Sequence, residues 1–162
     1  MVDFAPSSHL SADAAALESG AVVSTFLYAR LHHFSVLTQA MSAEEAASFV
    51  NEVRRMLTDA VRKLGGDICQ RRPDSILAVF SNKPDDRKPN HAQRGLHAAI
   101  LAVHEAVQLA QVIASRPQFA NLPLPTLAVG VHLGSAEITR RGNGASGKVQ
   151  AVGEAVEVAR LL

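Results

Sequence analysis

The stretch GGDICQRRPDSILAVF, residues 65–80, decides how this chain folds. Its two leading glycines can adopt the left-handed backbone that ends a helix, so a preceding helix is expected to stop there. The runs 67–71 and 75–80 then flank Arg72–Pro73–Asp74, which predicts a β-hairpin. The second run is apolar after its first residue, so it is expected to be the buried strand of the pair.

Two long helices are expected on either side of this hairpin. The first begins at Ser42, because Ser42 and Glu45 form the pattern of a capping box, in which each side chain binds a backbone N–H of the other residue. Its apolar residues recur at helical spacing: Phe49, Val50, Val53, Met56, Leu57, Ala60, Val61 and Leu64. The second helix is expected at about 90–114, with one apolar stripe toward the core: Leu96, Ala99, Ile100, Val103, Val107 and Ala110.

The rest of the chain predicts a sheet around the hairpin. The run AVVSTFLYARL, residues 21–31, is nearly continuously apolar and is typical of a central strand covered on both faces. Later segments are expected to be, in order, a buried strand at 126–133, its antiparallel continuation at 136–140, a flexible tip at 142–147, a strand at 148–152 and a helix from 154.

These elements indicate one domain with a short lead-in. Residues 1–20 are small and polar, and we expect a linker or a poorly ordered segment there. Residues 21–162 are expected to form the domain. Strands and helices that alternate around an embedded hairpin predict an α+β fold, a ferredoxin-like mixed sheet with a βαββαβ core covered by helices.

Composition narrows the functional classes. A net charge of +1 over 162 residues argues against nucleic acid as a partner. The single cysteine, Cys69, excludes an internal disulfide and is expected at a semi-buried strand position. No segment has the pattern of a signal peptide or a membrane span. We therefore expect a cytoplasmic domain without membrane contact of its own, alone or within a larger, membrane-attached signalling protein.

Four fragments stand in the order of a known family. They are Gly65–Gly66 with the hairpin ending DSILAVF (74–80), HAQR (91–94), GVHLG (130–134) and VGEAV (152–156). From about Val22 to Leu162, the chain resembles the class III adenylyl and guanylyl cyclase catalytic domain, without the family's C-terminal continuation. The resemblance implies a reaction in which two Mg²⁺ ions, held by two aspartates, activate the ribose hydroxyl and neutralise phosphate charge.

Only one of the family's two metal-binding aspartates is present in this sequence. The hairpin aspartate is present as Asp74, which is the one candidate metal ligand, whereas the first-strand aspartate is matched by Arg30. A guanidinium cannot bind Mg²⁺ and repels it. The family's glycine before the hairpin aspartate is Pro73, which cannot take a positive φ. We expect the Arg30 guanidinium to turn toward the Asp74 carboxylate and fill the space of the cations.

The nucleotide-binding positions also depart from the family. By resemblance, Gln70 replaces the lysine that selects adenine, and Gln150 replaces its partner. These two residues are the nucleotide-binding candidates. Glu157 stands in place of the asparagine that orients the ribose, and Leu161 in place of the transition-state arginine. Arg160 is adjacent, but one residue turns a helical side chain by about 100°, so it is not expected to take that role.

The sequence therefore favours a degenerate cyclase homology domain, acting as a signalling, dimerisation or nucleotide-sensing module without cyclase activity. The resemblance implies a homodimer or another cyclase-type domain as partner, and a nucleotide as a candidate ligand. No cofactor is expected. The alternative is a divergent cyclase that converts ATP or GTP to the cyclic 3′,5′-nucleotide, with a complementary partner domain; Mg²⁺ or Mn²⁺ belongs only to that alternative. A third hypothesis is an anion sensor that uses Arg30.

Overall fold

A five-stranded sheet forms the centre of the computed structural model, which describes residues 18–82, 90–141 and 148–162. Its strands are β1 (Glu18–His32), β2 (Asp67–Arg71), β3 (Ser75–Phe80), β4 (Thr126–Arg141) and β5 (Lys148–Val152), in the spatial order β2-β3-β1-β4-β5. The apolar run predicted to be a central strand is indeed β1, between β3 and β4. The α+β fold is confirmed.

All neighbouring strands are antiparallel, whereas the sequence predicted a mixed sheet. Each long helical connection joins two strands that have another strand between them. Thus β1 and β2 run in the same direction but are separated by β3, and β3 and β4 are separated by β1. Strands that run in the same direction are therefore never hydrogen-bonded to each other.

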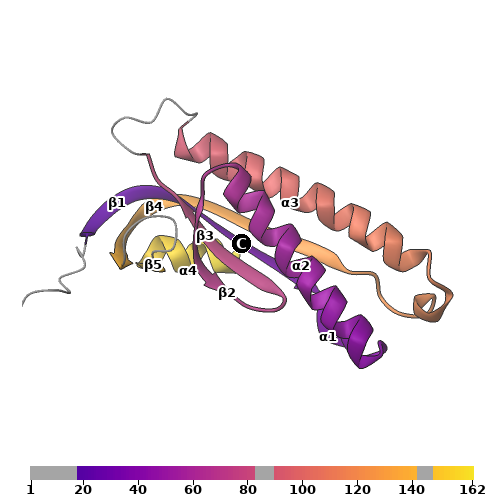
Figure 1. Ribbon diagram of the computed structural model, residues 1–162. Helices are drawn as coiled ribbons and strands as arrows, with labels where there is room; N and C mark the ends of the chain where they lie inside the picture. The colour runs from indigo at the N-terminus through magenta and orange to yellow at the C-terminus, as the bar shows by residue number, and fades with distance from the viewer. Residues whose placement is uncertain (1–17, 83–89, 142–147) are drawn as a thin grey trace, which may run out of the picture.

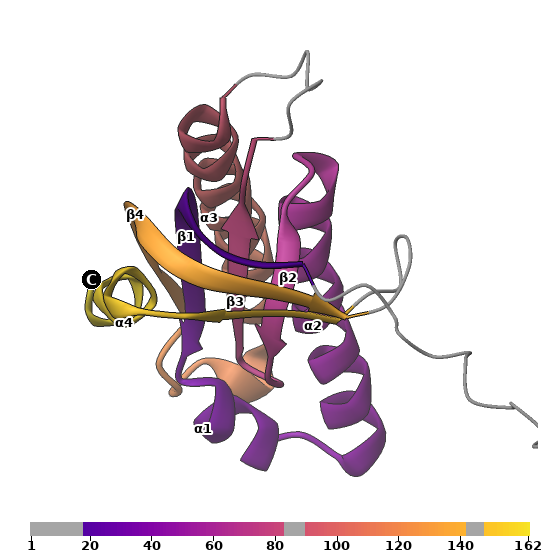
Figure 2. The ribbon, with the colours of Figure 1, turned by 90° about the vertical axis from the view of Figure 1, so that its left-hand side faces the viewer.

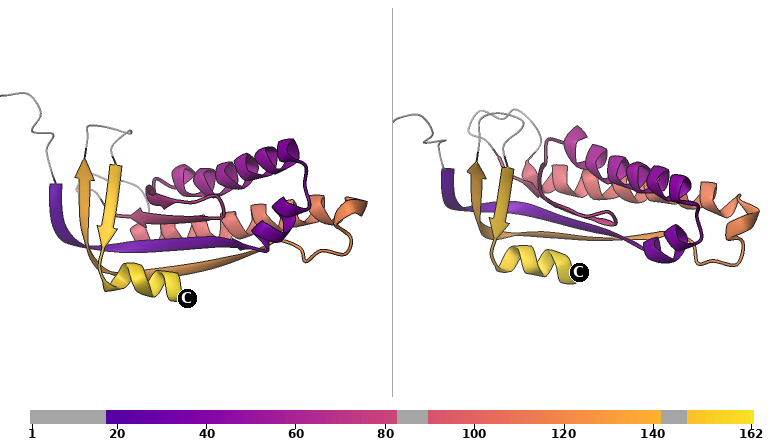
Figure 3. Two further views of the ribbon diagram at one scale, coloured as in Figure 1. Left: turned by 90° about the horizontal axis from the view of Figure 1, so that it is seen from below. Right: turned by 60° about the horizontal axis from the view of Figure 1, so that its bottom comes forward.

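Helices cover the two faces of the sheet unequally (Figure 1, Figure 3). The long helices α2 (Ala43–Lys63) and α3 (His91–Ala114) lie side by side on one face. The short helix α4 (Glu154–Leu161) lies on the other face, against β4 and β1. Figure 2 shows this three-layer arrangement end-on, with α4 and the C-terminus on the side away from α2.

The boundaries of several elements differ from those expected. β1 begins at Glu18, inside the segment interpreted as a lead-in. β4 is one strand of 16 residues that includes both segments predicted separately, because its pairing with β1 is unbroken from Thr126 to Arg140. A short helix α1 (Phe34–Gln39) was not predicted. The tip at 142–147 and most of the polar loop at 81–90 lie outside the described residues.

Helix α2 forms as its sequence predicts. The Ser42 hydroxyl accepts a hydrogen bond from the Glu45 backbone N–H at 3.3 Å, and the Glu45 carboxylate accepts one from the Ser42 N–H at 3.0 Å. The hydrogen bond from the Ser42 backbone N–H to the Glu45 carboxylate, and after it the Ser42 side chain, lower the pKa of Glu45. The predicted apolar stripe packs against the sheet, with these residues buried: Phe49, Val53, Met56, Leu57, Ala60 and Val61.

Helix α3 is turned differently from the prediction. Its buried face consists mainly of small residues: Gly95, Ala98, Ala99, Ala102, Ala106, Leu109 and Ile113. Most of the predicted core stripe is instead exposed, namely Leu96, Ile100, Val103 and Val107. The reason is close packing, since a Cβ on Gly95 would come within 2.6 Å of the Thr25 side chain on β1. Only small side chains fit where the helix approaches the sheet this closely.

One buried arginine ties the two long helices to the sheet. Arg94 is 3% exposed and donates hydrogen bonds to the carbonyl oxygens of Leu64 and Gly65 at the end of α2. It also donates to the carbonyl oxygen of Ser81, just after β3. These acceptors are carbonyls at the end of a helix and just after a strand, where the regular hydrogen-bond ladders stop, so the guanidinium provides donors to them inside the protein.

Helix α3 is also long and apolar enough to cross a membrane, judged by length and composition alone. The sequence prediction of no membrane-spanning segment overlooked this helix. The same test is passed by core helices of globular proteins, and α3 packs against both the sheet and α2. By itself the observation is weak evidence for a membrane span.

Candidate functional site

The end of the sheet where β1 meets the β2–β3 turn holds the first part of the site. The Nε of Arg30 on β1 lies 3.4 Å from the Oδ2 of Asp74 in the turn, as predicted from the sequence. Antiparallel pairing brings them together, because Arg30 is the register partner of Ser75, next to Asp74. The Arg30 side chain is 57% exposed and that of Asp74 is 25% exposed. A contact this open adds only about 0–1 kcal/mol to stability.

The hairpin turn holds Asp74 firmly through its backbone. The Asp74 carbonyl oxygen accepts a hydrogen bond from the Leu31 N–H at 2.8 Å, and the Arg72 N–H donates to the Ser75 carbonyl at 2.8 Å. The Ser75 hydroxyl donates to the second carboxylate oxygen of Asp74 at 3.2 Å. No residue of the turn has a positive φ, which agrees with the constraint expected from Pro73.

These residues do not fit a pair of magnesium ions. Mg²⁺ requires several oxygen ligands, and the neighbour of Asp74 is a positively charged guanidinium. Within the described residues, no group of three or more histidine, cysteine, aspartate or glutamate side chains is placed to hold one ion. The arrangement at Asp74 can bind an anion through Arg30, but it cannot supply the carboxylate pair of a two-metal reaction.

The second part of the site joins β2 to α4. Arg160 on α4 donates a hydrogen bond from Nη2 to the Oε1 of Gln70 on β2, at 2.9 Å. Its Nη1 lies 3.9 Å from the Oε1 of Glu157, one turn earlier on the helix. The structure thus brings together two positions singled out from the sequence, Gln70 and Glu157, through an arginine that the sequence analysis set aside. The side chain of Gln70 is already engaged by the protein itself.

The remaining predicted positions do not join this cluster. Leu161 is 86% exposed at the end of α4. Gln150 is exposed on β5, between Val149 and Ala151, which pack into the interior cluster beneath α4. Since side chains alternate along a strand, Gln150 points to the opposite face of β5. Among the described residues, no hydrogen bond joins the Gln150 side chain to Gln70, whose Oε1 accepts from Arg160.

The neighbouring part of β2 is structural. Arg140 on β4 donates a hydrogen bond to the Asp67 carboxylate at 2.8 Å, which fastens the far end of β4 to β2. Cys69 is half-buried between them on β2, as expected. Burial raises the pKa of Cys69 to about 12, and the nearby Asp67 charge adds to this, whereas Arg140 acts in the opposite direction.

A chemical consequence is that Cys69 should be an inert thiol. A pKa raised from 9.0 to about 12 lowers the thiolate fraction at pH 8 by two to three orders of magnitude. We expect Cys69 in the folded protein to react with a thiol reagent about a hundredfold more slowly than in urea-unfolded protein, with a rate that still rises with pH up to pH 10. Equal rates in the two states would contradict the burial of this thiol.

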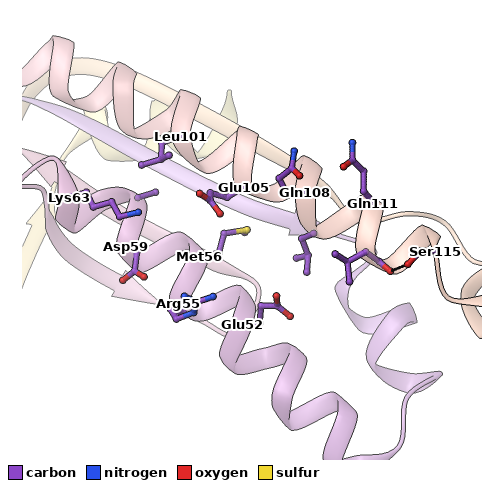
Figure 4. Close-up of a pocket in the computed structure, with 13 residues that line it drawn as sticks. Glu52, Arg55, Met56, Asp59, Lys63, Leu101, Glu105, Gln108, Gln111 and Ser115 are labelled. Atoms are coloured by element: carbon purple, nitrogen blue, oxygen red, sulfur yellow. Dashed lines mark hydrogen bonds between the residues drawn. The ribbon is translucent and has the colours of Figure 1, made fainter.

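A separate groove lies between α2 and α3, on the opposite face of the sheet (Figure 4). It has a volume of about 510 Å³, and α2 contributes a row of alternating charges, Glu52, Arg55, Asp59 and Lys63. Figure 4 shows these side chains along α2, facing Glu105 and other residues of α3. The buried residues of its lining, Met56, Ala60 and Leu109, are apolar, whereas most of its charged side chains are exposed.

Comparison with solved structures shows the fold. The chain matches a guanylyl cyclase, Cya2, with a TM-score of 0.68 and 18% sequence identity, over 88% of this chain and 70% of the cyclase chain. It matches a bacterial light-regulated adenylyl cyclase with a TM-score of 0.69 and 19% identity, over 91% of this chain but only 40% of that protein. The fold is thus that of adenylyl and guanylyl cyclase domains.

A third similar structure was solved as a dimer, and the guanylyl cyclase domain of the same fusion protein was also solved as a monomer. It is a non-canonical dimeric guanylyl cyclase domain from the aquatic fungus Blastocladiella emersonii, with a TM-score of 0.54 and 18% identity over 90% of this chain and 74% of that chain. No protein-family model matches the sequence, and no curated protein does. The likeness is therefore one of three-dimensional structure at low sequence identity.

Proposed function

We propose that this chain is a cyclase-type domain that does not cyclise nucleotides and acts in signalling by pairing with a second domain of the same type. One observation carries the proposal. Arg30 lies 3.4 Å from Asp74, at the place where the resemblance requires a second carboxylate. A positive charge there opposes the binding of divalent cations, and the resemblance makes those cations responsible for most of the catalysis.

The α4 side of the site supports the same proposal. Glu157 adds a negative charge where a polyanionic nucleotide would lie, and Leu161 offers no charge to a transition state. The Oε1 of Gln70 already accepts a hydrogen bond from Arg160, so this oxygen is not available to a nucleotide. A nucleotide that entered would have to displace this bond, so we place nucleotide sensing second to pairing. The single thiol of the chain, Cys69, stays protonated, which suits the reducing cytosol.

An active, divergent cyclase is the second candidate, and one observation favours it. Arg160 reaches the site from α4 although it is one residue away from the family position. An arginine beside Gln70 could serve a triphosphate if a partner domain supplied the missing carboxylate. This alternative requires a second, different chain.

The decisive measurement is a cyclase assay on the purified protein. With ATP or GTP and either Mg²⁺ or Mn²⁺, we expect no cyclic nucleotide above a heat-killed control, with an active cyclase run in parallel as the positive control. A titration of fluorescent nucleotide on the same sample should give the same affinity with and without the divalent ion. Metal-dependent cyclic product well above the control would overturn the proposed function.

A further inference from the structure

We propose that the side of α3 turned away from α2 is a docking surface, on which another copy of this chain binds through an antiparallel α3–α3 contact. This surface belongs to the face of the sheet that carries the long helices, not to the face that carries α4 (Figure 3). The inference rests on the proposed function only for its role in signalling, because the contact itself is argued from the side chains of α3.

An apolar stripe runs along this side of α3. Its members follow one another at alternating intervals of four and three residues, the spacing of the contact positions in a coiled coil: Leu96, Ile100, Val103, Val107, Ala110 and Ala114. The first four are 54%, 59%, 41% and 49% exposed. At 1.5 Å per residue the stripe is about 27 Å long, and a continuous apolar surface of this kind indicates a site of interaction.

No charge on the stripe opposes contact with a like surface. Among Lys, Arg, Asp and Glu, α3 contains only Arg94 and Glu105. Arg94 is buried, and Glu105 lines the groove toward α2, on the other side of the helix. The exposed side of α2, by contrast, bears charged residues such as Glu52 and Arg55. The exposed side of α3 therefore differs from the polar face that a helix normally presents to water.

The two halves of the stripe differ in shape. Its N-terminal half projects, because Leu96 and Ile100 are bulky and more than half exposed. Its C-terminal half ends in the small side chains of Ala110 and Ala114. Beside these alanines lies an apolar hollow of about 390 Å³, between α3 and residues 124–127 at the start of β4. The same stripe thus carries projecting side chains at one end and a hollow at the other.

Projection and hollow make the stripe complementary to itself. A two-fold axis at its middle sets Leu96 of each copy on Ala114 of the other, and Ile100 on Ala110. The bulky side chains then enter the hollow of the other copy, and every contact occurs twice. A parallel arrangement would instead set the bulky halves on each other and leave both hollows open. Close packing therefore selects a second copy in the antiparallel orientation as the occupant.

The first measurement is the dimer dissociation constant, by sedimentation equilibrium, of the wild type, Val107→Asp and Val112→Asp. Val107 and Val112 are 49% and 48% exposed on the same helix, but Val112 lines the groove toward α2 and is the matched control. Because Val107→Asp places a carboxylate from each copy inside the apolar contact, the constant should rise at least about tenfold. Val112→Asp should stay within about threefold of the wild type, and circular dichroism confirms that both variants are folded.

The second measurement tests the antiparallel register. In a Cys69→Ala background, Ile100→Cys combined with Ala110→Cys should form a covalent dimer on mild oxidation, because the contact brings these positions of different copies together. Within one helix they are about 15 Å apart, too far for an internal disulfide. Either cysteine alone should give less than about a tenth of this product. Efficient crosslinking by Ile100→Cys alone would show a parallel contact and overturn the proposed arrangement.

The outcomes separate this inference from the proposed function. A wild-type dimer that Val107→Asp does not weaken would overturn the α3 contact and leave the proposed function standing, because pairing would then use another face. A wild type that stays monomeric at high concentration, or that binds phosphatidylcholine vesicles without dimerising, would also overturn the contact. Cyclic nucleotide production by a dimer that Val107→Asp weakens would overturn the proposed function alone.

Discussion

Replacing Gly130 by alanine should destabilise the protein by at least about 2 kcal/mol and loosen α4. Gly130 lies on β4 directly under α4, and a Cβ there would overlap the carbonyl oxygen of Ala159 and lie 3.1 Å from Leu162. The obstacle is helix backbone, which cannot move aside as a flexible side chain would. The strand is fixed by its pairing with β1, so α4 is the element that must shift.

The measurement is urea unfolding combined with hydrogen exchange of the α4 amides. A loss of this size lowers Tm by about 4–8 °C in a domain of this length, and exchange should accelerate most within α4. Ala128→Val is the matched control, because it adds bulk on the same strand at an exposed position two residues earlier. An unfolding free energy of Gly130→Ala equal to that of the wild type would mean that α4 does not pack on β4 as described.

The same crowding explains where the sequence analysis succeeded and failed on the helices. The buried face of α2 consists of large apolar residues, so its spacing indicated the correct face. In α3 the buried face consists mostly of alanines with Gly95, while the larger residues Leu96 and Ile100 are exposed. Ranking positions by hydrophobicity therefore selected the wrong face. Small residues recur at 95, 98, 102 and 106, and this recurrence indicates that the helix approaches the sheet closely. The sequence prediction did not use this pattern.

The two halves of the site were predictable to different degrees. The resemblance to the cyclase family placed the first strand beside the hairpin turn, and the antiparallel register of β1 with β3 brings Arg30 to Asp74. The contact of Arg160 with Gln70 depends on where a C-terminal helix lies relative to an edge strand 90 residues away. The 100° turn per helical residue excluded Arg160 from the position of the family's transition-state arginine. The same geometry does not tell which side chain of β2 the Arg160 guanidinium can reach.

We predict that the wild-type protein binds no divalent cation at Asp74 and that Arg30→Asp creates such a site. The substitution puts a second carboxylate beside Asp74, on a strand whose register with the turn is already set. At about 4 Å in water-like surroundings, a unit-charge pair is worth about 1 kcal/mol, and a dication doubles this. The substitution replaces a repulsion of this size by an attraction of the same size, so the interaction energy with the cation changes by about 4 kcal/mol. This corresponds to about a thousandfold gain in Mn²⁺ affinity.

Two readouts test this gain, and two variants isolate its cause. Mn²⁺ binding followed by electron paramagnetic resonance should appear in Arg30→Asp, and the same ion should raise the Tm of this variant alone, because it relieves the repulsion between two adjacent carboxylates. Arg30→Asn removes the positive charge without adding a ligand, and Arg72→Asp adds a carboxylate elsewhere in the turn, so neither should bind the ion comparably. If Arg30→Asp stays folded and binds no Mn²⁺, the charge at position 30 is not what excludes metal. The backbone set by Pro73 would then aim the Asp74 carboxylate away from any shared ion, and the hairpin rather than the strand would be where metal binding was lost.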